Sequence, residues 1–101
     1  MTFNKQWPER VFTVKDEGER PRIITVKGRN RWALEHLIHA GAQGCTPIDR
    51  PGPRWSAYVF KLRKKGVNIE TLHESHEGPF PGYHARYVLR SSVTPGRKAL
   101  A

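Results

Sequence analysis

Residues 54–71 read RWSAYVFKLRKKGVNIET, and this stretch decides the fold. Trp55, Val59 and Leu62 recur at the spacing i, i+4 and i+7, at which side chains share one face of an α-helix. A proline one residue before the stretch can open the helix, and the glycine after RKK can end it. We therefore predict a helix over residues 53–65 that buries an apolar stripe and is followed at once by a strand.

Two further helices are expected earlier in the chain. Asn30 is a suitable N-cap for a helix over residues 31–40, whose apolar face would be buried. Thr46 followed by Pro47 is another helix-start signal, and the Pro-Gly pair that follows leaves room only for a short helix over residues 47–50. The apolar face of the longer helix consists of Ala33, Leu34, Leu37 and Ile38.

Runs of β-branched and alternating apolar residues predict two β-hairpins. Residues 11–14 and 23–26 form the strands of the first, and residues 67–72 and 83–89 those of the second. Because an isolated hairpin is not stable, the first is expected to extend the sheet of the domain or to form the contact of a homodimer. Residues 91–101 carry few apolar side chains, so we expect a mobile basic tail there.

The order of helix, short helix, basic helix and hairpin is that of a winged helix-turn-helix domain. The stretch quoted above, followed by YHARYVL at residues 83–89, resembles the small winged helix-turn-helix proteins of bacteriophages and bacteria. The resemblance covers residues 31–89 and implies an α+β fold with a three-helix core and a C-terminal hairpin wing. We expect an N-terminal β-hairpin extension over residues 1–27, the winged domain over residues 28–90, and the tail.

The charge of the chain indicates a polyanionic partner. It has 18 Lys and Arg against 9 Asp and Glu, a net charge of +9, and residues 50–65 include six basic side chains and no acidic one. At ~100° per residue, Arg54, Tyr58 and Lys61 fall on a face beside the apolar stripe, which we expect to be exposed to solvent. Arginine and lysine on such a face can contact guanine edges and phosphates.

These observations predict a protein that binds double-stranded DNA by placing helix 53–65 in the major groove, as a transcriptional regulator or a phage or mobile-element accessory factor. Small residues at two positions of this helix would let it approach the base edges, and one arginine of the wing could reach a phosphate. The residues expected to contact DNA are Arg50, Arg54, Ser56, Ala57, Tyr58, Lys61, Lys64, Lys65 and Arg86.

Other partners are open at this point. Phe60 on the basic helix and Trp32 on the first helix could form an interface with a host protein, as in an inhibitor of a nucleic-acid enzyme, although we favour their packing beneath the first hairpin. RNA is disfavoured, because no strand carries the aromatic platform of sheet-based RNA readers. Lys64 and Lys65 could also be solvated cations at a helix C-terminus.

The sequence offers no sign of an enzyme, a cofactor or a metal site. His73, His76 and His84 are the nearest to a ligand set, but positions i and i+3 of one strand point to opposite faces. Cys45 is the single cysteine and is expected to be a small buried residue. With no apolar run long enough for a bilayer or a signal peptide, we expect a cytoplasmic, nucleoid-associated protein.

Overall fold

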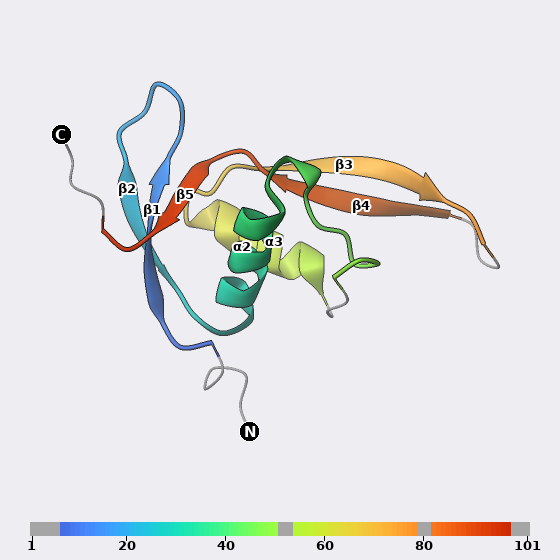
Figure 1. Cartoon of the computed structure of the whole chain (residues 1–101), viewed down its shortest axis with the longest axis horizontal. Coiled ribbons are helices and arrows are strands. Elements are labelled where there is room, and N and C mark those ends of the chain that lie inside the picture. The colour runs from blue at the N-terminus through green and yellow to red at the C-terminus, as the bar shows by residue number, and fades with distance from the viewer. Residues whose placement is uncertain (1–6, 51–53, 79–81, 98–101) are drawn as a thin grey trace.

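A three-stranded sheet and a long two-stranded hairpin flank a pair of packed helices (Figure 1). The computed structural model describes residues 7–50, 54–78 and 82–97. In chain order the elements are β1 (Arg10–Lys15), β2 (Arg22–Val26), α2 (Gly28–Ala40), the 3-10 turn η1 (Gly41–Gln43), α3 (Trp55–Lys64), β3 (Ile69–His76), β4 (Gly82–Leu89) and β5 (Ser92–Pro95).

Both expected hairpins are present. Strands β1 and β2 pair antiparallel with Phe12 opposite Ile24, and β3 and β4 pair antiparallel with Thr71 opposite Tyr87. The second hairpin is longer than the alternating pattern indicated and extends well beyond the helices (Figure 1). A backbone bridge between Cys45 and Tyr87 joins its base to the segment between the helices.

The expectation of a mobile tail is wrong for residues 92–95, which form strand β5 against β1 in the sheet order β2-β1-β5. Val93 is buried opposite Val14, and the Thr13 hydroxyl donates to the Gly96 carbonyl at 2.7 Å. Pairing satisfies backbone groups that an open edge of β1 would leave unbonded, so four residues of modest apolar content become ordered. Residues 98–101 of the expected tail lie outside the described residues.

The expected short helix over residues 47–50 is a turn, so the described residues contain two α-helices and not a three-helix core. The start signal itself is present. The Thr46 hydroxyl accepts hydrogen bonds from the amides of Ile48 and Asp49, and the Asp49 carboxylate accepts one from the Thr46 amide at 2.8 Å. Among the described residues one helical backbone bond follows, from the Arg50 amide to the Thr46 carbonyl, and the next residue in the sequence, Pro51, has no amide hydrogen with which to continue the series.

One apolar core joins both hairpins to the helices. The expected stripe of α3 is buried, as are Ala33, Leu34 and Leu37 of α2, and the first hairpin contributes Phe12, Val14, Ile24 and Val26 to the same cluster. Trp55 lies at its centre, stacked on Tyr87 with 6.0 Å between ring centroids and its indole N–H bonded to the Arg50 carbonyl at 2.8 Å. The N-terminal hairpin is therefore part of the packing that positions α3.

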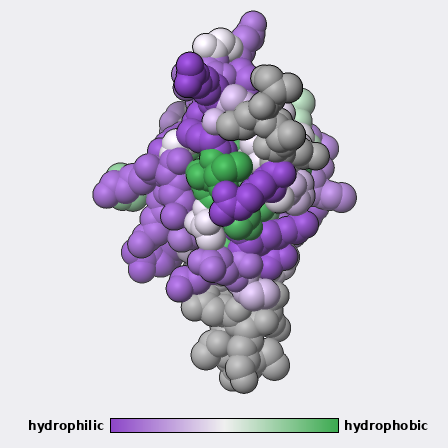
Figure 2. Space-filling view, turned by 90° about the vertical axis from the view of Figure 1, so that its left-hand side faces the viewer, coloured by the Kyte–Doolittle hydropathy of each residue, from purple (hydrophilic) through white to green (hydrophobic). Residues whose placement is uncertain are grey.

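The three-stranded sheet turns one face to the core and the other to solvent. Ile23 of β2 is 37% exposed, whereas its neighbour Ile24 is buried. Figure 2 looks onto this side of the molecule and shows a mostly hydrophilic surface around a small apolar patch. Neither of the described helices is long and apolar enough to cross a membrane.

Candidate nucleic-acid interface

The buried side of α3 is wider than the predicted stripe of Trp55, Val59 and Leu62, so the exposed face of the helix is narrower than expected. Tyr58 was expected to face solvent, but it is only 9% exposed and its ring packs edge-on against Trp32 and Trp55 at 6.3 and 6.4 Å. The expectation was wrong because a tyrosine ring is largely apolar and can extend a stripe at i+3. The exposed side chains of α3 are Ser56, Phe60, Lys61, Arg63 and Lys64.

Arg54 caps α3 in a left-handed backbone conformation. Its φ and ψ are 66° and 41°, the only positive φ of a non-glycine residue in the part of the chain that the structure describes. Its carbonyl accepts the first bond of the helix from the Ala57 amide at 2.9 Å. The helix thus begins one residue after Arg54, and the expected start at Pro53 lies outside the described residues.

A groove of about 640 Å³ runs between the start of α2 and the exposed edge of α3. Lys27 and Arg29 enter it from the start of α2, and Arg54 and Lys61 from α3. None of the described residues that line it is acidic, and the first turn of α2 contains no acidic residue either. The N-terminal end of the α2 dipole adds to the positive potential of the groove. Asn30, Ala57 and Tyr58 complete its lining.

The sequence reading missed Lys27 and Arg29. They lie about 25 to 35 residues before the basic residues of α3. A count of charges over a short window of sequence therefore does not group them with Lys61. The packing of α2 on α3 brings them together. The available signal was a pair of basic residues at a helix start, where the dipole disfavours cations and another reason for their presence is needed.

A family model described as a winged helix domain matches residues 23–99, which run from β2 to beyond β5. The chain belongs to the winged helix domain family. This confirms the resemblance seen in the sequence, and winged helix domains are in general DNA-binding modules. No curated protein and no solved structure matches the chain.

In this winged helix domain the β3–β4 hairpin is the wing, and its basic residues are already paired. The Arg86 guanidinium donates to the Glu74 carboxylate at 2.6 Å and to the Gln43 carbonyl at 2.9 Å. The Glu74 contact raises the pKa of Arg86 above its usual value and lowers that of Glu74. Arg90 pairs in the same way with Glu70 at 2.6 Å. The expected contribution of Arg86 to DNA binding would have to compete with these carboxylates.

Three other basic side chains lie away from the groove. Arg50 lines hollows beside His39 of α2, and not the groove between α2 and α3. Arg63 donates to the Ile69 carbonyl at 2.7 Å and to the Thr71 hydroxyl at 2.8 Å, which ties the end of α3 to the wing. Lys65 is exposed at the C-cap of α3, where a cation also suits the helix dipole.

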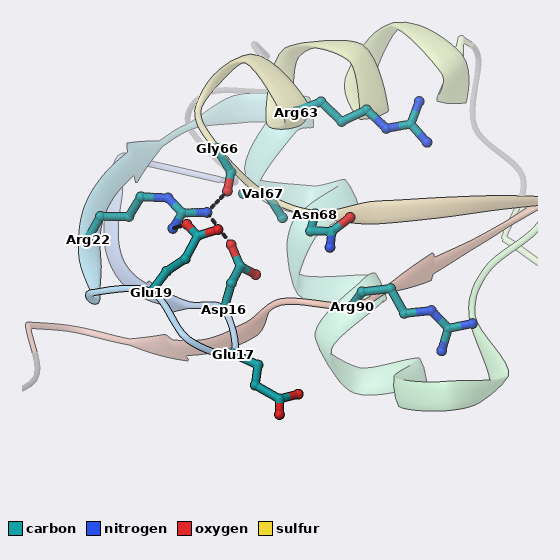
Figure 3. Close-up of a pocket in the computed structure, with 9 residues that line it drawn as sticks. All are labelled: Asp16, Glu17, Glu19, Arg22, Arg63, Gly66, Val67, Asn68 and Arg90. Atoms are coloured by element: carbon teal, nitrogen blue, oxygen red, sulfur yellow. Dashed lines mark hydrogen bonds and ion pairs between the residues drawn. The ribbon is translucent and has the colours of Figure 1, made fainter.

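Another hollow, which Arg63 helps to line, is a structural junction (Figure 3). Asp16 at the end of the β1 strand accepts hydrogen bonds from Arg22 at 2.7 Å and from the Ser91 hydroxyl at 2.5 Å, and Arg22 also donates to the Gly66 carbonyl. The Arg22 contact lowers the pKa of Asp16 below its usual value. Acidic and basic side chains neutralise each other in this hollow. The groove between α2 and α3, in contrast, is lined among the described residues by charged side chains that are all basic.

Two of the three histidines of the wing form a pair. His76 and His84 meet through their Nδ1 atoms at 3.0 Å, and the second ring nitrogen of His84 lies 3.2 Å from Glu74. No group of three described His, Cys, Asp or Glu residues is arranged to hold a metal ion. Cys45 is fully buried beside the α2 helix, and burial raises the pKa of its thiol to about 11. This thiol is protonated at neutral pH, which disfavours it as a nucleophile.

Proposed function

We propose that this winged helix domain binds double-stranded DNA through the exposed face of α3 and the basic groove beside it. The observation that carries the proposal is the groove itself, which is lined by Lys27, Arg29, Arg54 and Lys61 and has no acidic residue among the described residues of its lining. The phosphates of a DNA strand are a polyanion that suits a cluster of basic side chains, since their neutralisation releases condensed counterions.

The two sides of the groove suit different tasks. Lys61 and the small residues Ser56 and Ala57 lie on α3, which would enter the major groove and approach base edges. Lys27 lies at the start of α2, where it would contact the phosphate backbone and fix the orientation of α3. The wing would contribute less, because Arg86 and Arg90 are held by its own carboxylates.

The proposed role is binding without catalysis, in a cytoplasmic regulator of transcription or an accessory factor of a phage or mobile element associated with the nucleoid. The support for this is the DNA-binding character of the family, together with the likeness of residues 54–71 and 83–89 to small phage and bacterial proteins. A homodimer and a host-protein partner stay predictions.

The test is the double variant Lys27→Gln, Lys61→Gln, compared with the control Lys15→Gln, Arg20→Gln. Both remove two positive charges, but Lys15 and Arg20 are exposed at the β1–β2 turn and do not line the groove. If each groove lysine neutralises one phosphate, the double variant should bind duplex DNA on the order of 60-fold more weakly at about 0.1 M salt. The slope of log K against log salt should fall by about 1.8.

Fluorescence anisotropy with a labelled duplex across a salt series measures both quantities. The control variant should bind within about threefold of the parent, because screened charges at a distance contribute little. Equal losses in the two double variants would show that net charge and not the groove determines binding. A parent protein that fails to bind any duplex at low salt would overturn the proposal.

A further inference from the structure

Phe60 stands at the centre of the exposed face of α3. The residue is 58% exposed. The buried side of α3 consists of Trp55, Tyr58, Val59 and Leu62. Around the helix axis, Phe60 projects about 150° from the middle of that buried side. Ser56 lies one turn before it and Lys64 one turn after it. A large apolar ring therefore lies near the middle of the exposed face and points away from the core of the protein.

The neighbours of Phe60 leave its outer side open and basic. The Lys64 ammonium lies 5.0 Å from the centroid of the ring, within range of a cation–π contact. Ser56 and Ala57 are too small to cover it, so the ring stands above the helix surface. A helix that enters a DNA groove by this face presents Phe60, with Lys64 beside it, to the floor of the groove and Lys61 to one wall.

We propose that Phe60 contacts the C5 methyl groups of thymine in the major groove, so that the protein prefers thymine-containing sites. This inference rests on the proposed function. Among the four standard bases only thymine places an apolar group on the floor of the major groove, and phenylalanine is one of the side chains suited to contact it. The contact buries apolar surface on both partners and provides specificity that phosphate contacts lack.

A protein partner is the competing explanation for an exposed aromatic ring, and the surroundings of Phe60 disfavour it. The cores of protein interfaces are depleted in lysine. Lys61 and Lys64 adjoin Phe60, and α3 contains no acidic residue that could balance them. Phosphates on both walls of a DNA groove provide that balance.

The experiment begins with selection of duplexes from a pool with a randomised central segment. The selected duplex is then synthesised in two forms, with thymine and with uracil, which differ only by the methyl group. The parent should bind the uracil form about fourfold more weakly for each methyl group contacted. Phe60→Ala should bind the thymine form more weakly and should lose the preference for thymine over uracil.

Two further variants control this comparison. Phe60→Leu keeps an apolar side chain and should retain part of the thymine preference. Ile23→Ala removes an exposed apolar side chain from the opposite sheet and should keep the whole preference. Because Phe60 is exposed, Phe60→Ala should melt within a few degrees of the parent, which separates a lost contact from a lost fold.

The outcomes separate this inference from the proposed function. Duplex binding without enrichment of thymine, or with equal affinity for the thymine and uracil forms, overturns the role of Phe60 and leaves DNA binding intact. Retention of the full preference in Phe60→Ala overturns it as well, and a protein contact then becomes the better account of the ring. Absence of duplex binding in the parent removes the proposed function and this inference with it.

Discussion

Replacement of Arg54 by glycine should stabilise the fold while it weakens DNA binding. Arg54 holds φ at 66°, a conformation that costs a residue with a Cβ roughly 1 to 2 kcal/mol. Glycine removes this cost but loses about 0.5 to 1 kcal/mol through the greater freedom of the unfolded chain. The Arg54→Gly variant should therefore gain about 0.5 to 1 kcal/mol over Arg54→Ala, which keeps the strain.

The same two variants remove the same charge from the groove. If Arg54 neutralises one phosphate, each should bind duplex DNA about eightfold more weakly than the parent at about 0.1 M salt. Glycine and alanine should thus agree in affinity and differ in stability. That pattern would mean that backbone strain at the start of α3 is retained for the position of the arginine side chain.

Thermal unfolding followed by circular dichroism, with anisotropy for binding, measures both effects. For a domain of this size the gain corresponds to a melting temperature about 2 to 8 °C higher for Arg54→Gly than for Arg54→Ala. A glycine variant that melts at or below the alanine variant would refute the argument from the left-handed backbone. Parental affinity in both variants would remove Arg54 from the interface.

The remaining predictions concern the packing that positions α3 and the wing. Trp55→Ala should lower the free energy of unfolding by about 3 to 5 kcal/mol, because the ring is only 2% exposed; a variant with parental urea unfolding would contradict its central place in the core. Gly44→Ala should cost at least ~2 kcal/mol, because Gly44 has φ 73° and a Cβ there would lie 2.5 Å from the Tyr87 carbonyl oxygen. Gly18→Ala is its control, with φ 77° and open space, and a similar loss in both would show that the contact with Tyr87 is unimportant. Asp16→Asn should cost about 1 kcal/mol at pH 7 through weaker bonds to Arg22 and Ser91. Since the folded pKa of Asp16 lies below its usual 3.8, this difference should be fully present above about pH 4 and shrink as the pH falls through the folded pKa; a difference that stays constant down to pH 2 would speak against it.

The local elements of this protein could be predicted from the sequence because their signals lie within a few turns of chain. The i, i+4, i+7 spacing of Trp55, Val59 and Leu62 identified α3 and its buried side, and Gly66 marked its end within two residues. Runs of β-branched and aromatic residues identified the first hairpin, and alternation of apolar and polar residues identified the second. The winged family was indicated by the order of these elements together with the resemblance of residues 54–71 and 83–89 to small winged helix-turn-helix proteins. The helix and the strands could be predicted because their local residue patterns are contained in the sequence directly.

Only the tertiary structure decided which residues meet across that framework. Tyr58 is buried because Trp32, 26 positions earlier, covers it, and no local period shows that contact. Ser92–Pro95 becomes a strand because β1 offers an unpaired edge. The basic groove exists because α2 packs on α3 and places Lys27 near Lys61. Charge and polarity are properties of single residues, whereas a binding site depends on distances that are set by packing. The sequence therefore indicated a basic DNA-binding helix, and the tertiary structure decided which face of that helix is exposed.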